Sequence, residues 1–451
     1  MEKVINEINN ILWGGGMIIL ILGAGIYLTV ATRFFQFRKV KMIFRETILS
    51  LFKDKSVRKS NDKKSISQLQ AVSTALAATM GTGNIAGVAS ALTLGGAGAV
   101  FWMWVSSLFG MMIVFCENVL GIYYRYKNAS GEWVGGPMVY LEKGLGSKKL
   151  GMVYAVFCVL ASFGMGNITQ INSISLSAKA SFGVPCVVTG IFAAILIGII
   201  IFGGLKRIGS VTEKLIPILS LAYILGSIII IVINFKAIPS AFSAIFRGAF
   251  GLDSITGGIC GAAIKQAVSV GLRRGVFSNE AGLGSTVMVH AASDIKSPIK
   301  QGMWGIFEVF LDTIVCCTLT ALVILTSGAM SCKGIKLDGA ALVIKAFESG
   351  FGHFSGIFVT ASVSLFAFAT VLGWSVFGLK AFEYVFGEGY SIYYKLIYVL
   401  LILFGATGSI NLIWGISDIF NGFMAIPNLI GVLLLSPVML KALKNYPGKE
   451  L

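Results

Sequence analysis

The stretch "ATMGTGN" at residues 78–84 places two glycines, two threonines and an asparagine within seven residues of a long apolar segment. These residue types are weak helix formers. Gly81 and Gly83 also permit non-helical dihedral angles and a close approach of a ligand to backbone N–H groups. Carbonyl oxygens freed just before them can ligate a hard cation such as sodium. Because unpaired backbone at membrane depth is tolerated only where it lines a cavity or binds something, the stretch predicts a broken helix that forms a binding site.

The composition indicates a membrane protein with many spans. Of the 451 residues, 56% are hydrophobic and 12% are charged, whereas a soluble domain carries about 25% charged residues. Apolar runs recur along the whole chain and predict about eleven transmembrane helices. The expected spans are 11–31, 66–95, 98–124, 150–178, 184–204, 212–234, 258–291, 300–327, 354–385, 393–409 and 411–441. The first run follows an acidic start, so we interpret it as a retained helix and not as a signal peptide.

The distribution of positive charge predicts the orientation of the chain. The net charge is +16, and 11 of the 36 lysines and arginines lie between residues 32 and 65. Loops of this kind face the cytoplasm. We therefore expect a plasma-membrane protein with its N-terminus outside and, after eleven spans, its C-terminus inside. Since no soluble segment gathers the charge, the expected partner is the lipid bilayer and not nucleic acid.

Motifs of enzymes and metal centres are absent from the sequence. The seven cysteines form no CxxC pair, so neither a disulfide framework nor a metal site follows. The two histidines form no HExxH motif. We expect no enzymatic activity and no cofactor.

A repeat links the first stretch to a second one. A shift of 195 residues aligns "GTGNIAGVASAL" with "VFSNEAGLGSTV", and in the same register "LFGMMIVFCE" with "MWGIFEVFLD". The alignment pairs Asn84 with Asn279, and Glu117 with Asp312. The two copies begin spans two and seven, and an odd number of spans between their starts inverts the second copy in the membrane.

The repeat divides the chain into three parts. Residues 1–65 hold a peripheral first helix and the basic loop, residues 66–257 hold the first repeat with spans two to six, and residues 258–451 hold the second with spans seven to eleven. In membrane proteins built this way, the first helix of each half is broken near the midplane, where it forms the binding site. We expect the second break within residues 269–279. The predicted fold class is an all-α polytopic membrane protein with a five-plus-five inverted repeat.

Five stretches carry a resemblance to a known family: "TMGTGNIAGVA" (79–89), "GGPMVYLEKGLG" (135–146), "RRGVFSNEAGLGS" (273–285), "FAFATVLGW" (366–374) and "GISDIFNGFMAIPN" (415–428). In these stretches the chain resembles the alanine or glycine:cation symporters of the amino acid–polyamine–cation superfamily. The resemblance implies the leucine-transporter-like fold of the neurotransmitter:sodium symporters. It also implies sodium-coupled import of small neutral amino acids, alanine and glycine, by alternating access.

Other functions are weighed against this one. A nucleobase as the solute, and protons as the coupling ion, stay open as alternatives within transport. A channel is disfavoured because one chain already carries both halves of an alternating-access core. An intramembrane enzyme is disfavoured because no Ser–His or paired-Asp constellation is present.

A zwitterionic amino acid needs donors for its carboxylate and acceptors for its ammonium group. The N–H groups around Gly81 and Gly83 provide the donors, together with the hydroxyls of Thr79 and Thr82. Carbonyls near residues 276–278, up to Ser278, provide the acceptors. Span four adds two amides, of which Gln170 is favoured for substrate contact and Asn167 for helix packing. Three aromatic residues are expected to set the size of the pocket: Phe163, Phe277 and Trp374.

The resemblance implies one sodium site between the first broken helix and span nine. Its candidate ligands are the carbonyls of Ala77, Met80 and Ala367 and the hydroxyl of Thr370. Val371 stands where related proteins often carry a second hydroxyl, which leaves the number of ligands open. Asn84 is a candidate ligand of a second ion or, equally, a structural residue.

Charged groups inside the spans are functional candidates because their burial is expensive. Arg273, Arg274 and Glu280 are expected to pair with one another near the second break, as a gating network that Glu117 or Asp312 would assist. Direct contact of an arginine with the substrate carboxylate, and proton relay through Glu117 and Asp312, are the alternatives. Segments 236–257 and 328–352 are candidate sites of short external helices.

Overall fold

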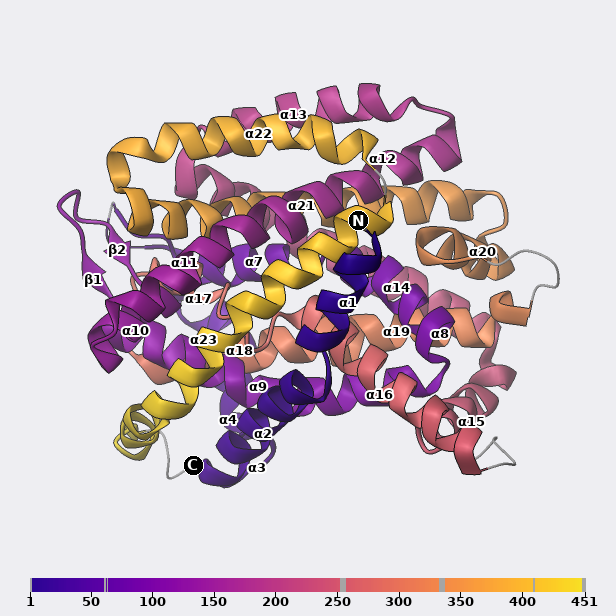
Figure 1. Ribbon diagram of the computed structural model, residues 1–451, viewed down its shortest axis with the longest axis horizontal. Helices are drawn as coiled ribbons and strands as arrows, with labels where there is room; N and C mark the ends of the chain where they lie inside the picture. Colours follow the sequence, from indigo (N-terminus) through magenta and orange to yellow (C-terminus); the bar gives the residue numbers. More distant parts are fainter. Residues whose placement is uncertain are drawn as a thin grey trace.

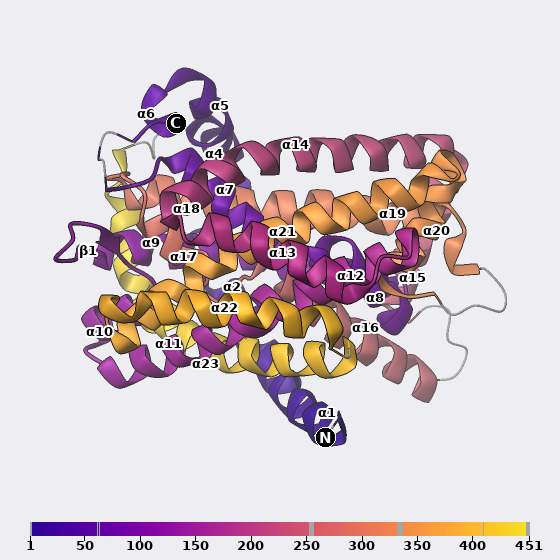
Figure 2. The same ribbon diagram turned by 90° about the horizontal axis from the view of Figure 1, so that it is seen from above.

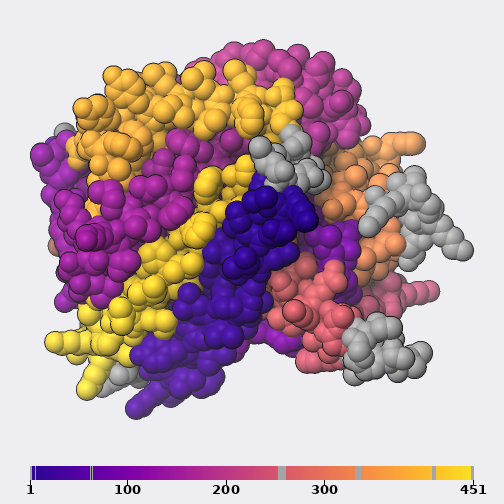
Figure 3. All heavy atoms as spheres, in the orientation of Figure 1, coloured from indigo at the N-terminus to yellow at the C-terminus, as the bar shows by residue number. Residues whose placement is uncertain are grey.

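The computed structural model describes residues 2–60, 62, 64–251, 257–331, 337–408 and 410–447. The N-terminal part forms six helices: α1 (Glu2–Leu12), α2 (Gly15–Ala31), α3 (Phe35–Arg38), α4 (Val40–Glu46), α5 (Ile48–Lys53) and α6 (Lys55–Arg58). Helices α1 and α2 lie on the outside of the bundle beside the last helix (Figure 3). The short helices α3–α6 carry the basic segment.

The first half of the remaining chain follows in order. It comprises α7 (Gln68–Thr79), a 3-10 turn (Thr82–Asn84), α8 (Ala86–Gly95), α9 (Gly98–Tyr124), the antiparallel strands β1 (Tyr126–Lys127) and β2 (Trp133–Val134), α10 (Pro137–Leu145), α11 (Lys148–Phe163), a π-helical turn (Gly164–Ile168), α12 (Thr169–Phe182), α13 (Cys186–Ile201), α14 (Gly204–Ile233), a 3-10 turn (Phe235–Ala237) and α15 (Ile238–Ala249).

The second half of the chain is also helical, with a broken first helix as in the first half. It comprises α16 (Gly257–Asn279), α17 (Val287–Ala291), α18 (Pro298–Val309), a π-helical segment (Phe310–Cys317), α19 (Thr318–Thr326), a 3-10 turn (Ala329–Ser331), α20 (Gly339–Phe351), α21 (Phe354–Phe386), a 3-10 turn (Glu388–Tyr390), α22 (Ser391–Thr407) and α23 (Ile410–Lys444). The short helices α15 and α20 fall in the two segments for which external helices were considered.

The helices form one bundle whose two ends differ (Figures 1 and 2). The basic segment α3–α6, the β1–β2 hairpin, α10 and the C-terminus lie at one end, and α15 and α20 lie at the other. Within the described residues, eight helices are long and apolar enough to cross a membrane, and α8 and α13 are shorter apolar helices. Helices α13, α14 and α22 expose large aliphatic and aromatic side chains, including Phe192, Leu225 and Leu400. This arrangement is that of a multi-pass membrane protein, and the count of eleven spans stays a prediction.

The first predicted break is present. Helix α7 begins at a capping box in which the Ser67 hydroxyl accepts from the Gln70 amide and the Gln70 side chain accepts from the Ser67 amide. It ends at Thr79, the 3-10 turn follows, and α8 resumes at Ala86. The weak helix formers of "MGTGN" therefore interrupt the helix where the sequence predicted.

The second break lies outside the predicted range. Residues 269–279 are helical to the end of α16, and the interruption covers residues 280–286. It begins where Glu280 takes a positive φ of 56°, followed by Gly282 at 90° and Gly284 at 68°. Positive φ values terminate α-helices. The prediction was wrong because "GLRRG" continues as helix, and the stop is set by "EAGLG" just after it.

Helices α9 and α15 touch through glycines, which makes Gly98→Ala a sensitive test of the packing. A Cβ atom at Gly98 would overlap the backbone of Gly248 and Ala249, which cannot yield as a flexible side chain can. We expect a loss of about 3 kcal/mol of stability, the upper range for overpacking, seen as a lower thermal unfolding midpoint in detergent. Gly23→Ala, where a Cβ atom meets nothing within 4 Å, is the matched control. An unchanged midpoint in Gly98→Ala would contradict this packing.

Candidate functional site

The two breaks meet inside the bundle. A Cβ atom built on Gly83 would lie 3.3 Å from the Cα atom of Ser278 and 3.5 Å from Cδ1 of Phe277. Both of those residues belong to the last turn of α16, directly before the second break. All three are buried. The structure thus brings together the two stretches that the repeat aligned.

Gln170 contacts the first break directly. Its Oε1 atom accepts from the backbone amide of Thr82 at 3.2 Å and from the Thr82 hydroxyl at 3.1 Å. Its Nε2 atom donates to the carbonyl of Met165, in the π-helical turn between α11 and α12, at 3.1 Å. π-Helical turns often occur at functional sites. Gln170 therefore occupies the donors that the sequence had assigned to a carboxylate.

Helix α21 packs against α7 beside the break. The Thr370 hydroxyl donates to the carbonyl of Ala77 at 2.9 Å and to that of Phe366 at 3.1 Å. A Cβ atom on Gly373 would lie 2.9 Å from the Ala78 backbone nitrogen, so a glycine is needed for this close approach. Two of the four predicted sodium ligands, Ala77 and Thr370, are thus in contact across the two helices.

The other ligand candidates lie close by. Met80 is buried, its amide donates to the carbonyl of Leu76 at 2.8 Å, and its sulfur accepts from the Ser220 hydroxyl at 3.5 Å. Ala367 is buried in the interior of α21, one turn before Thr370.

Three other predicted side chains face their own helix or a neighbouring one. The Thr79 hydroxyl turns back to the carbonyls of Ala75 and Leu76, at 3.3 and 3.4 Å. The Asn167 amide donates to the carbonyl of Tyr398 in α22 at 2.6 Å, which is a helix-packing contact. Phe163 stacks on Tyr394 with ring centroids 5.4 Å apart.

Glu280 and Trp374 join the second break to α21. The indole N–H of Trp374 donates to Oε1 of Glu280 at 2.7 Å, and the Ser285 hydroxyl donates to Oε2. Both Glu280 and Trp374 are buried. The left-handed conformation of Glu280 is a strained one for a non-glycine residue. Its carboxylate is held by two neutral donors, Trp374 of α21 and Ser285 near the end of the seven-residue break.

Trp374→Phe tests this link. The substitution keeps an aromatic ring but removes the donor to a buried carboxylate, a loss of about 1–3 kcal/mol. We expect a lower thermal unfolding midpoint. Trp102→Phe is the matched control because its indole makes only a 3.4 Å contact with the carbonyl of Ala249. Equal behaviour of the two variants would show that the Glu280 contact has no role.

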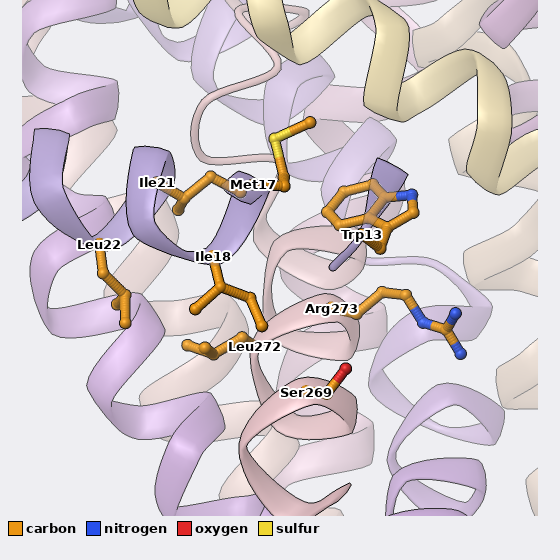
Figure 4. Close-up of a pocket in the computed structure, with 8 residues that line it drawn as sticks. All are labelled: Trp13, Met17, Ile18, Ile21, Leu22, Ser269, Leu272 and Arg273. Carbon is orange, nitrogen blue, oxygen red and sulfur yellow. The ribbon is translucent and has the colours of Figure 1, made fainter. Parts of the chain in front are cut away.

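The arginines of α16 do not pair with Glu280, which corrects the expected network. Arg273 lies 4.0 Å from the Asp418 carboxylate of α23. The Trp13 indole donates to the Asp418 carbonyl at 2.9 Å, and Figure 4 shows Trp13 and Arg273 lining one small cavity between α2 and α16. The guanidinium of Arg274 lies 4.9 Å from the Trp414 ring centroid. Both arginines contact residues of α23, which is distant in the sequence. The spacing of residues around the arginines therefore gave no sign of these contacts.

Arg274 also lines a second cavity, on the α20 side of the breaks. This cavity has a volume of about 560 Å³ and lies between α8, α12, α16, α20 and α23; its polar lining is Ser90, Ser173, Ser177, Arg274 and Asp338. Trp414 lines it as well and stacks on Phe277 with centroids 5.0 Å apart. The Phe277–Trp414 stack therefore stands between this cavity and Gly83.

Glu117 lies on α9 against the loop of the second break. Its Oε1 atom accepts from Nδ2 of Asn428 at 2.5 Å, and the same Nδ2 atom donates to the carbonyl of Gly282 at 2.8 Å. Tyr140 donates to Oδ1 of Asn428. Glu117 thus positions the loop through an amide and not through an arginine.

Asp312, the repeat partner of Glu117, contacts both breaks. Its Oδ1 atom accepts from Asn84 at 2.6 Å, and its Oδ2 atom accepts from Ser278 at 2.8 Å. Asn279, the repeat partner of Asn84, donates instead to Thr313 at 3.1 Å.

Sequence reasoning missed several of these residues. His290 and Glu308 form a buried pair with Nε2 and Oε1 2.8 Å apart. Asp418 and Asn428 lie in the quoted stretch "GISDIFNGFMAIPN" but were not singled out. Polar side chains on an otherwise apolar span were the available signal.

Comparison with solved structures defines the class of protein. The crystal structure of MhsT in complex with L-phenylalanine is similar, with a TM-score of 0.62 at 14% identity over 83% of this chain and 90% of that one. Identity this low shows the fold alone. Together with the two facing breaks, it defines a leucine-transporter-like fold with two inverted halves.

Sequence comparison then identifies the family. The model of the sodium:alanine symporter family matches residues 1–450. The sodium/alanine symporter AgcS of Methanococcus maripaludis is 42% identical over 449 residues, which cover 98% of this chain and 97% of AgcS. The probable sodium/glutamine symporter GlnT of Bacillus subtilis is 37% identical over 452 residues, covering 100% of this chain and 91% of GlnT. This chain belongs to the sodium:alanine symporter family, whose members are amino acid symporters and not enzymes.

Proposed function

We propose that this protein imports small neutral amino acids, alanine and glycine, together with sodium ions. The observation that carries the proposal is the contact of the Thr370 hydroxyl with the Ala77 carbonyl, 2.9 Å apart. These two oxygens come from α21 and from the last turn of α7, directly before the first break. A sodium ion that both oxygens ligate couples the position of α21 to the break, because neither helix can move without losing a ligand.

The amino acid binds between the two breaks. Its carboxylate displaces the Gln170 amide oxygen from the N–H and hydroxyl of Thr82, and its ammonium group meets the carbonyl end of α16 at Phe277 and Ser278. A helix C-terminus favours a cation. Gly81 and Gly83 keep the backbone accessible, and Phe277 and Trp374 bound the pocket.

The close packing around the breaks supports a small substrate. Gly83 lies directly against Ser278 and Phe277, and Gly81 lies against Thr370 and Gln170. A larger side chain requires these contacts to open. The pocket therefore favours alanine and glycine over glutamine, the substrate for which the relative GlnT is named.

The remaining assignments follow from the same proposal. Residues 66–257 and 258–451 form the two inverted halves, and residues 1–65 form a peripheral addition. The basic segment α3–α6 and the C-terminus share one end of the bundle, and we assign that end to the cytoplasm because of its lysines and arginines. The N-terminus then lies outside the plasma membrane.

Uptake of labelled alanine into proteoliposomes tests the proposal. We expect uptake under an inward sodium gradient and none when potassium replaces sodium. Competition by unlabelled glycine and glutamine measures the size limit, and glycine is expected to compete better. Uptake that continues on a proton gradient without sodium would contradict sodium coupling. Absence of alanine uptake under either gradient would contradict the substrate, and a nucleobase would then be the next solute to test.

A further inference from the structure

Arg274 is a buried cation with unused hydrogen-bond donors. The residue is only 8% exposed, and its Nε and Nη1 atoms have no hydrogen-bond partner among the described residues. Its guanidinium lies 4.9 Å from the Trp414 ring centroid and 5.8 Å from that of Phe277. The neighbouring Arg273 has the Asp418 carboxylate at 4.0 Å, whereas Arg274 forms no ion pair in the part of the chain that the structure describes. Because a buried charge without a partner is costly, the free N–H groups indicate an anionic ligand.

The cavity that Arg274 lines also carries a fixed negative charge. Asp338 lines the same cavity from the start of α20, which its side chain caps by accepting from the Gly339 amide at 2.6 Å. Its Oδ1 atom also accepts from the hydroxyls of Ser90 at 3.1 Å and Thr93 at 3.0 Å, both on α8. These contacts hold the carboxylate in place between α8 and α20. Asp338 is exposed, so this side of the cavity is accessible from outside the bundle.

A cavity with one fixed cation and one fixed anion suits a ligand that carries both charges. We propose that it is a second binding site for a zwitterionic amino acid, separate from the site between the two breaks. The ligand's carboxylate accepts from the free N–H groups of Arg274, and its ammonium group pairs with Asp338. Charge-assisted hydrogen bonds of this kind are stronger than neutral ones. The inference rests on the proposed function, from which it takes the class of solute, and it adds an earlier place at which that solute binds.

The position of the cavity makes it the first site that an external amino acid meets. Helix α20 lies at the end of the bundle opposite to the basic segment α3–α6 (Figure 2), the end assigned above to the outside. The stacked rings of Phe277 and Trp414, 5.0 Å apart, stand between the cavity and Gly83. An amino acid held at Arg274 therefore waits outside this stack, and the stack must open before the amino acid reaches the first break.

The outer cavity is roomier than the site between the breaks. Its volume of about 560 Å³ lies in the range of roughly 300–1,000 Å³ that is usual for small-molecule sites. Leu94, Leu176 and Ile344 give it an apolar wall, which suits a branched aliphatic side chain. The surroundings of Gly81 and Gly83, in contrast, are closely packed. The outer cavity therefore admits amino acids that the inner site rejects, and leucine binds there without being transported.

Binding of labelled leucine to the purified protein tests the site without any need for transport. Arg274→Gln and Asp338→Asn are each expected to weaken leucine binding about tenfold or more, because each removes a charged partner. Glu348→Gln is the matched control, since it removes an exposed acid of α20 that pairs with Lys345 at 2.6 Å; leucine binding should not change. Gly81→Ala alters the inner site alone and is also expected to leave leucine binding unchanged.

A second probe, 4-methylpentanoate, separates a zwitterion site from a site for any anion. It has the carbon skeleton and carboxylate of leucine but lacks the ammonium group. The wild type is expected to bind it about tenfold more weakly than leucine; Arg274→Gln should weaken it further, and Asp338→Asn should not. Equal affinities for leucine and 4-methylpentanoate, or displacement of both by chloride, would overturn the proposal in favour of an anion site.

The Asp338→Asn variant keeps the proposal testable if Arg274→Gln fails to fold, because Asp338 is exposed. Equal leucine binding by the wild type and folded Asp338→Asn would refute the site, as would loss of leucine binding in a folded Gly81→Ala variant. If leucine binding depends on both charges but alanine is not taken up under any gradient, the proposed function fails and the outer site stands.

Discussion

Thr370→Val is expected to raise the sodium concentration for half-maximal alanine uptake about 30-fold. Valine keeps the branched shape of threonine but lacks the hydroxyl that contacts the Ala77 carbonyl across α21 and α7. The loss of an interaction with a charged group costs about 2 kcal/mol, which corresponds to this factor. The measurement is initial uptake in proteoliposomes as a function of sodium at constant ionic strength.

Two control variants separate ion binding from folding. Thr370→Ser restores the hydroxyl and is expected to recover most of the sodium affinity. Thr212→Val removes another buried hydroxyl, which contacts Thr74 at 2.9 Å between α14 and α7. This control is expected to leave the half-maximal sodium concentration unchanged. If Thr370→Val also left that concentration unchanged, the hydroxyl would not be a sodium ligand.

Gly81→Ala is expected to have the second large effect. A Cβ atom at this position would lie 2.5 Å from the Thr370 hydroxyl and 3.1 Å from Oε1 of Gln170. It would therefore push on the proposed ion ligand and on Gln170, the side chain that occupies the proposed substrate donors. Overpacking costs about 1–3 kcal/mol, or about 5–150-fold, and we expect both alanine and sodium affinity to fall.

Gly83→Ala is the matched control for this substitution. Its Cβ atom would lie 3.3–3.6 Å from Ser278 and Phe277, a tight contact that small shifts can relieve. We expect a smaller loss of alanine affinity and little change in sodium affinity at Thr370. Thermal unfolding midpoints of both variants separate binding from folding. Equal sodium affinities in Gly81→Ala and the wild type would contradict the placement of Gly81 beside the ion.

The first break was predictable from sequence because its causes are local. Glycine, threonine and asparagine within one stretch interrupt a helix wherever the fold places it. The repeat then indicated that a partner existed, and Gln170 could be favoured because an amide deep in a span faces the interior of a bundle. The fold class followed from the same three observations.

The second break and the charged contacts depended on information that is not local. The glycines of "GLRRG" did not end α16, because a glycine in a helix costs only about 1 kcal/mol and tertiary packing overrides it. The end of α16 depends on a positive φ at Glu280. Glutamate rarely adopts this conformation, so the sequence does not indicate it. Arg273 contacts Asp418 and Arg274 contacts Trp414, both on α23 and more than a hundred residues away. The nearness of the arginines to Glu280 in the sequence therefore did not predict their partners.

The central claim is that sodium and the amino acid share the first break, and reciprocal binding tests it most directly. Alanine affinity of the purified protein is measured as a function of sodium, and sodium affinity as a function of alanine. Two ligands coupled through one protein must change each other's affinity by the same factor. We predict that each ligand tightens the other by about tenfold or more, and that Thr370→Val weakens this coupling. An alanine affinity independent of sodium would contradict the account.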